Sequence, residues 1–244
     1  MKKRYGFGAL LAIALSMCTS CGNLPGRPRA GDIPIDPDKV TDFTLLFGKN
    51  CSGCHGTEGK GGAALSITDP IYLAIADDTV LRKVITNGIA GTSMPAFAKT
   101  AGGMLTETQV DVIVRGLREH YAKPNVLVGV TAPPYSAAEL GDSRRGGVVY
   151  DTYCASCHGA NGKGGKASSI VDGSFLALLT DQELRTLVIV GRPDFGAPDW
   201  RSNIPGKPMS AQEISDVVAW LSAQRPEFAG RPYPNTTKTS GEAQ

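Results

Sequence analysis

This sequence of 244 residues is poor in several features that define large classes of protein. It has only three histidines, and it has no run of eighteen or more apolar residues, which excludes a polytopic membrane protein. Strand signals, meaning short alternating apolar and polar runs, are absent, so we expect an all-α fold. Positive charge is not in excess: without Lys2, Lys3 and Arg4, 22 basic residues face 23 acidic ones. This balance argues against nucleic acid as a partner.

The features that are present describe a globular, loop-rich chain. Hydrophobic residues make up 41% of the sequence, which is too many for a disordered protein, while 30 glycines and 16 prolines indicate long connections. The length suits one large domain or two small ones. Six cysteines are the most informative count, and their positions guide the interpretation below.

The N-terminal segment reads as an export signal. Residues 1–21 combine a basic start, a short apolar core and two cysteines, Cys18 and Cys21, just beyond that core. A cysteine at this place resembles the lipobox of bacterial lipoproteins, so we expect Cys21 or Cys18 to be lipidated; a plain signal peptide with incidental cysteines is the alternative. Residues 22–39, rich in proline and glycine, would form a tether. The protein is then expected on the periplasmic side, anchored to the membrane by lipid.

The rest of the chain contains an internal repeat. Cys-Ser-Gly-Cys-His at 51–55 returns as Cys-Ala-Ser-Cys-His at 154–158, an offset of 103 residues. The offset holds without a gap from Leu45 to Phe97, and it resumes after one inserted residue at Thr106 and Ser210. Two copies are too few for a solenoid, so the repeat indicates a duplicated domain.

The repeat divides the chain into domains of similar layout. A short helix leads into each Cys-X-X-Cys-His motif, a glycine-rich loop follows it, and two further helices begin at polar caps and show helical apolar spacing. We predict domain one at 40–122, a Pro/Gly-rich linker at 123–144, domain two at 145–225 and a flexible tail at 226–244.

The Cys-X-X-Cys-His motif favours covalent haem attachment, because two thiols on one helical turn can add across the two vinyl groups and the adjacent histidine can bind the iron. A zinc site would need a fourth ligand that neither motif supplies, and a redox dithiol would need a βαβ surround that is missing here. We therefore expect two haem c groups, one in each domain. Their expected attachment residues are Cys51, Cys54, Cys154 and Cys157, and their expected proximal iron ligands are His55 and His158.

With these motifs in place, the chain resembles the class I cytochrome c family in tandem, diheme form. The resemblance includes the Gly-Lys-Gly-Gly after each motif, Gly-Thr-Ser-Met-Pro-Ala-Phe at 91–97, and the closing helix around 213–221. It implies that the second iron ligand is a methionine in a loop before the last helix, which is Met94 in domain one. A thioether opposite an imidazole favours Fe(II) and raises the reduction potential.

Domain two departs from this pattern. The gap-free offset places Ala197 opposite Met94, and alanine cannot bind iron. Met209 is the remaining methionine nearby, but its counterpart in domain one is Leu105, which suggests a buried apolar residue. Three options stay open for haem two: ligation by Met209, a five-coordinate or water-bound iron, or ligation by Lys207 or another group.

The function expected from this reading is single-electron transfer outside the cytoplasm. The partners would be redox proteins, in particular a membrane respiratory or photosynthetic complex, and no catalytic residue is assigned. The alternative is a small diheme oxidoreductase of the peroxidase or thiosulfate dehydrogenase type, which would use an open position at haem two. A ligand-sensing haem module is a third reading. His120, the third histidine, is expected on the surface.

Overall fold

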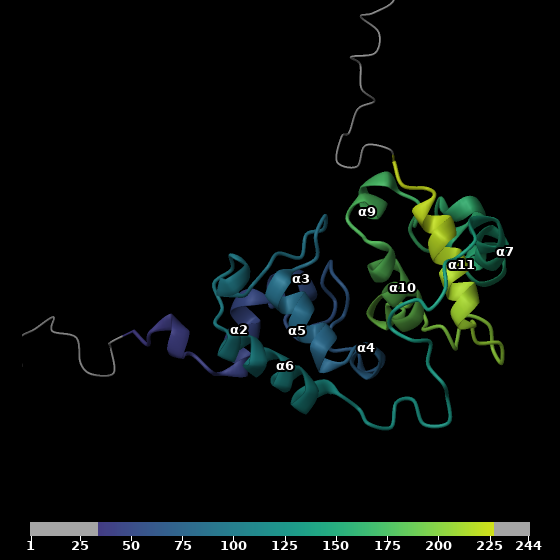
Figure 1. Cartoon of the computed structure of the whole chain (residues 1–244). Helices are drawn as coiled ribbons and strands as arrows, with labels where there is room; N and C mark the ends of the chain where they lie inside the picture. The colour runs from purple at the N-terminus through teal and green to yellow at the C-terminus, as the bar shows by residue number, and fades with distance from the viewer. Residues whose placement is uncertain (1–33, 227–244) are drawn as a thin grey trace, which may run out of the picture. The chain divides into compact units, whose positions relative to one another are not determined.

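The computed structural model describes residues 34–226, and within that range it consists of helices joined by loops, with two isolated β-bridges and no strand (Figure 1). The expected all-α fold is confirmed. The predictions for the signal peptide, for Cys18 and Cys21, and for the tail after Pro226 lie outside the described residues. Domain one contains α2 (Phe43–Asn50), α3 (Ser52–His55), α4 (Pro70–Ile75), α5 (Asp78–Asn87) and α6 (Glu107–Tyr121); domain two contains α7 (Ser143–Tyr153), α8 (Ala155–His158), α9 (Gly173–Ala177), α10 (Asp181–Val190) and α11 (Ala211–Ser222).

The internal repeat is also a structural repeat. Helices α8 and α10 have the same lengths as α3 and α5 and start 103 residues later, and α11 starts 104 residues after α6, as the single inserted residue requires. The predicted helices around each motif are therefore found in both copies. The sequence did not predict the short helices α4 and α9, because segments of six and five residues are too short to show helical apolar spacing.

Side-chain caps fix where the longer helices begin. The hydroxyl of Thr180 accepts the N–H of Glu183, and the Glu183 carboxylate accepts the N–H of Thr180, which together form a capping box. The last helix of each domain begins in the same way, with the pairs Thr106–Gln109 and Ser210–Glu213. These caps satisfy backbone donors that the first helical turn leaves without a partner.

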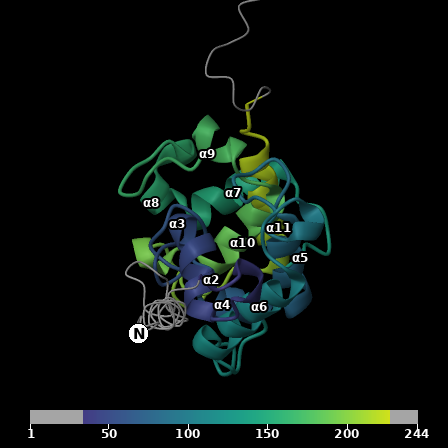
Figure 2. The same ribbon diagram turned by 90° about the vertical axis from the view of Figure 1, so that its left-hand side faces the viewer.

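The first and last helices of each domain pack against each other, α2 on α6 and α7 on α11 (Figures 1 and 2). In domain one the large residue lies on the first helix: Phe43 faces Gly116, and a methyl group at 116 would lie 2.1 Å from the Phe43 ring. In domain two the sizes are exchanged, because Gly146 stands at the position of Phe43 and Trp220 at the position of Gly116. A methyl group at 146 would lie 2.7 Å from Trp220 Cβ. At each crossing, one bulky side chain therefore fills the space that a glycine on the other helix leaves.

An aromatic residue connects each crossing to its Cys-X-X-Cys-His motif. Phe47 is 4% exposed, and the centre of its ring lies 5.6 Å from that of Phe43. Its counterpart Tyr150 stacks on Trp220, with 4.3 Å between the ring centres. The carbonyls of Phe47 and Tyr150 each accept the N–H of the first motif cysteine at 2.8 Å. The packing of the crossing therefore fixes where the motif starts.

The linker between the domains is held by side chains of domain two. Buried Arg185 donates to the carbonyls of Pro134 and Tyr135 at 3.0–3.2 Å, and Gln182 donates to the Tyr135 carbonyl at 2.8 Å. Helix α7 begins at Ser143, inside the segment 123–144 that the sequence assigned to the linker, because Asp142 caps it. Between residues 34 and 226, no helix has both the length and the apolar character that crossing a membrane requires.

The α7–α11 crossing gives a test of the packing. We expect Gly146→Ala to lower the free energy of unfolding of domain two by about 1–3 kcal/mol, because the new methyl group would lie 2.0 Å from the Asp216 carbonyl oxygen, which is backbone and cannot rotate away. The neighbouring Gly147→Ala is the control, since its nearest atoms, in Trp220, lie at 3.5 Å. Denaturant unfolding followed by circular dichroism measures both. Equal stability of the two variants would contradict the role of Gly146.

Candidate haem-attachment sites

Each Cys-X-X-Cys-His motif forms one turn of helix, α3 or α8. The first cysteine, Cys51 or Cys154, caps the turn, and the histidine is its last residue. Cys51 and Cys154 are half-buried, whereas the second cysteines, Cys54 and Cys157, are exposed. Both thiols of each motif therefore lie within one helical turn, with the histidine next to the second of them.

The two motif histidines are oriented by the same hydrogen bond. His55 Nδ1 lies 2.7 Å from the carbonyl oxygen of Leu65, and His158 Nδ1 lies 2.8 Å from that of Ser168. Because a carbonyl can only accept, Nδ1 carries the proton in both rings. The lone pair of Nε2 is then available to a metal, which is the arrangement typical of metal-binding histidines.

The glycine-rich loops bring those carbonyls into place. Gly56 has a φ of 88°, and a side chain there would run into the Lys60 carbonyl at 1.9 Å, so the chain can turn back only at a glycine. The loop then returns to the motif, where the N–H of Ala64 donates to the Cys54 carbonyl at 3.0 Å. Domain two repeats this contact between Ala167 and Cys157 at 2.9 Å.

Burial disfavours the thiolate form of the first cysteine in each motif. Burial, reinforced by the neighbouring Cys54, raises the pKa of Cys51 to about 12, and burial with Cys157 raises the pKa of Cys154 to about 11. Reactive and metal-binding cysteines instead need a stabilised thiolate. Within residues 34–226, no three His, Cys, Asp or Glu side chains gather into a group that would hold a metal ion. The donor set present, two thiols and an Nε2 lone pair on one turn, fits a covalently attached haem.

The loop before the last helix carries Met94 in domain one. Met94 is half-buried, its carbonyl accepts the N–H of Ile89 at 3.0 Å, and its own N–H donates to the Thr92 hydroxyl at 3.2 Å. The same backbone bond recurs in domain two, where the N–H of Arg192 donates to the Ala197 carbonyl at 3.0 Å. Ala197 therefore occupies the backbone position of Met94, and the domain-two loop has no thioether there.

Met209 lies in the core of domain two. Only 3% of it is exposed, and its N–H donates to the Trp200 carbonyl at 2.9 Å, as the N–H of Leu105 does to Phe97 in domain one. The Asn203 side-chain amide donates to the Met209 sulfur at 3.8 Å. Met209 thus has the packing of its counterpart Leu105, which is 5% exposed.

Two further residues singled out in the sequence are Lys207, an optional ligand, and His120, an expected surface residue. The Lys207 ammonium lies 5.1 Å from the centre of the Tyr153 ring, in a cation–π contact. His120 is exposed and stacks on Phe43 at 5.1 Å between ring centres, as expected for a surface residue.

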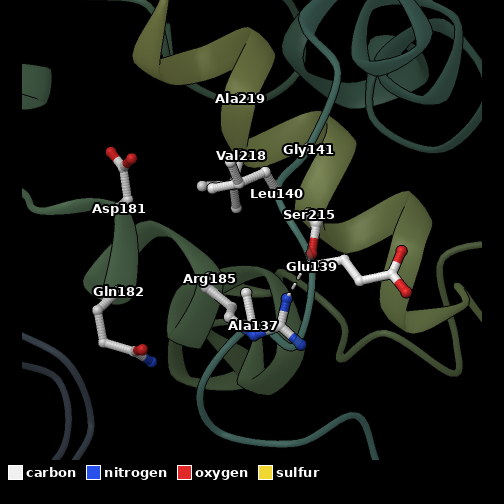
Figure 3. Close-up of a pocket in the computed structure, with 10 residues that line it drawn as sticks. All are labelled: Ala137, Glu139, Leu140, Gly141, Asp181, Gln182, Arg185, Ser215, Val218 and Ala219. Carbon is white, nitrogen blue, oxygen red and sulfur yellow. Dashed lines mark hydrogen bonds between the residues drawn. The ribbon is translucent and has the colours of Figure 1, made fainter.

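A cavity of about 240 Å³ lies away from both motifs, between the linker, α10 and α11 (Figure 3). Arg185 points across it and donates to the Ser215 hydroxyl at 3.1 Å. In domain one the counterparts Arg82 and Asp111 form an ion pair. Domain two replaces that carboxylate with Ser215 and the linker carbonyls, so the cavity belongs to the linker attachment and contains no residue of either motif.

Two all-α domains, each with an oriented motif histidine and two thiols on one turn, define a tandem c-type cytochrome. The family described as cytochrome c oxidase, cbb3-type, subunit III, matches residues 38–115 and again residues 141–221. The chain belongs to this family, whose cytochrome c character implies covalently bound haem c.

Two relatives of this chain are named as subunits of larger complexes. The chain is 31% identical over 135 residues to a cbb3-type cytochrome c oxidase subunit CcoP of Azospirillum sp. (strain B510), a match that covers 51% of this chain and 40% of that protein. It is 25% identical over 227 residues to a cytochrome bc1 complex cytochrome c subunit of Mycobacterium tuberculosis (strain ATCC 25618 / H37Rv), covering 91% of this chain and 77% of that protein. A chain of the Kuenenia stuttgartiensis reducing HAO-like protein complex is 17% identical with a TM-score of 0.44, and the match covers 79% of this chain and all of that one.

Proposed function

We propose that this protein binds two haem c groups and transfers single electrons between extracytoplasmic redox partners, as part of, or docked on, a membrane respiratory or photosynthetic complex. The observation that carries the proposal is the duplicated contact in which His55 and His158 each donate Nδ1–H to a loop carbonyl ten residues later. The relatives named above, a cbb3-type oxidase subunit and a bc1 complex subunit, support a respiratory partner.

Each residue of the two motifs has a distinct role in this proposal. Cys51 and Cys54, and their counterparts Cys154 and Cys157, form the thioether bonds, while His55 and His158 supply Nε2 to the iron. When bound, haem c supplies an iron centre that alternates between Fe(III) and Fe(II). The protein contributes the orientation of the imidazoles, through the carbonyls of Leu65 and Ser168, and the choice of the second ligand.

The second ligand differs between the domains. Met94 occupies the half-buried loop position in domain one and would raise the potential of haem one. For haem two we favour the open or water-bound option over Met209, because Met209 is packed in the core at the place of Leu105 and would have to leave it to reach an iron. Haem two should then have the lower potential.

Haem content tests the proposal directly. The mature protein should contain two covalently bound haems per chain in a pyridine haemochrome assay. The variants Cys51→Ser/Cys54→Ser and Cys154→Ser/Cys157→Ser should each retain one, because the attachment residues of the other domain are untouched. Zinc in place of haem, or a single haem in the unaltered protein, would refute the proposal.

Ligand variants test the difference between the haems through the long-wavelength band that methionine ligation gives to ferric haem. The unaltered protein should show the band at the intensity of one haem, and Met94→Leu should abolish it. Ala197→Met should increase it toward the intensity of two haems, since it places a thioether at the backbone position equivalent to Met94. Met209→Leu is the matched control and should leave the band unchanged; loss of part of the band in this variant would assign Met209 as a ligand instead.

A second candidate function rests on Ala197. An iron without a methionine is open to small ligands, which would suit a diheme oxidoreductase or a sensing module. Carbon monoxide binding to the reduced protein tests whether haem two is open, and assays of peroxide and thiosulfate turnover separate the roles of an open haem: turnover indicates an enzyme, and binding without turnover leaves electron transfer or sensing.

We also propose that the protein is exported and held on the membrane surface by a lipid on Cys21 or Cys18. Its basic and apolar N-terminal segment supports this location. The intact protein should partition into a detergent phase. One of the two variants Cys21→Ser and Cys18→Ser, the one that removes the lipidated cysteine, should move it into the aqueous phase. Partitioning that neither substitution changes would exclude the lipid anchor.

A further inference from the structure

A loop of domain two makes hydrogen bonds to the glycine-rich loop of domain one. The loop contains the 3₁₀ turn η6 (Pro193–Phe195) and precedes Ala197. One carboxylate oxygen of Asp194 accepts the N–H of Gly61 and the hydroxyl of Ser66, both at 2.9 Å. Arg192 Nη2 donates to the carbonyl of Gly62 at 2.8 Å.

Arg192 and Asp194 also bind each other with the two-point geometry of a strong ion pair. Arg192 Nε lies 3.0 Å from one carboxylate oxygen of Asp194, and Nη2 lies 2.9 Å from the other. Their side chains are 17% and 10% exposed, although Asp194 as a whole residue is exposed to solvent. The guanidinium also lies over the Phe195 ring, 4.5 Å from its centre, which fixes it further.

This ion pair is bound next to the residue that orients His55. Ser66, whose hydroxyl binds Asp194, directly follows Leu65, whose carbonyl accepts His55 Nδ1–H. Gly61 and Gly62 have no side chain with which to anchor this part of the loop, and Gly61 has a φ of 74° with open space around it. Contacts from domain two supply that anchor.

The contact runs in one direction only. The counterparts of Arg192 and Asp194 in domain one are Ile89 and Gly91, which have no charged group to offer. In domain two the counterpart of Ser66 is Ser169, and its hydroxyl donates within its own loop, to the Gly162 carbonyl at 3.1 Å. Within residues 34–226, these hydrogen bonds from the other domain reach the histidine loop of domain one and not that of domain two.

We propose that Arg192 and Asp194 are positioning residues for His55, through which domain two sets the orientation of the domain-one imidazole and hence the potential of haem one. This inference rests on the proposed function. In domain one, the loop before the last helix carries the expected ligand Met94. The equivalent loop of domain two lacks that methionine and instead supports His55 of domain one. The Nδ1–H···O=C bond makes the imidazole a stronger donor, which favours Fe(III), so loosening the loop should raise the potential.

Hydrogen exchange at the Gly61 amide tests the contact. In Asp194→Ala this amide loses its acceptor and should exchange at least about tenfold faster, as expected for a lost hydrogen bond to a charged group. Asp194→Asn keeps an acceptor oxygen and should give a smaller increase. Asp151→Asn is the control for loss of a negative charge, because Asp151 is exposed on α7. At the equivalent position of domain one, Gly48 likewise has open space around it. Unchanged exchange in Asp194→Ala would overturn the proposal, whatever the haem content of domain two.

The potential of haem one, followed by its methionine band, tests the positioning role. It should rise in Asp194→Ala, rise less in Asp194→Asn and stay in place in Asp151→Asn. Ser66→Ala should raise it alone but add little in the Asp194→Ala background, because both changes remove the same hydrogen bond. Faster Gly61 exchange with an unshifted potential would overturn the role in positioning His55. Failure of the proposed function would show separately, as a haem count below two in the unaltered protein.

Discussion

The hydrogen bond from each motif histidine to a loop carbonyl is the constraint on which the rest of both domains depends. It requires that a loop of ten residues leave the motif, turn back and present the oxygen of Leu65 or Ser168 to the imidazole. The glycine after the histidine serves that return, as does the backbone bond from the loop to the second cysteine. A free Nε2 on a ring of fixed orientation is what a histidine needs in order to bind a metal.

Duplication preserved this constraint and allowed the packing around it to diverge. The crossing of first and last helices needs one large and one small residue, but it does not matter which helix provides which. Domain one uses Phe43 with Gly116, and domain two uses Gly146 with Trp220. Both arrangements place an aromatic residue, Phe47 or Tyr150, beneath the start of the motif. The volume of a close-packed core is conserved even where its residues are exchanged.

The loop before the last helix shows the opposite behaviour, because its backbone is retained while its chemistry changes. The bond between Ile89 and Met94 recurs between Arg192 and Ala197, so both loops hold the same turn. In domain one the turn presents a thioether, and in domain two it presents an ion pair to the other domain. Two motifs of one ancestry thereby acquire different surroundings, as the proposed difference between the two haem potentials requires.

Much of this protein was determined by its sequence alone. The repeat, the helical class, the capping boxes and the two Cys-X-X-Cys-His turns follow from local patterns, since caps and turns involve residues three or four positions apart. The substitution of Met94 by Ala197 was visible as well, because the offset of 103 residues has no gap there. Only the tertiary structure decided the rest. The burial of Met209, the exchange of Phe43 for Trp220 across the helices, and the bonds from Asp194 to Gly61 and Ser66 join residues far apart in the chain. Such contacts depend on how the elements pack, and no local pattern in a single sequence encodes them.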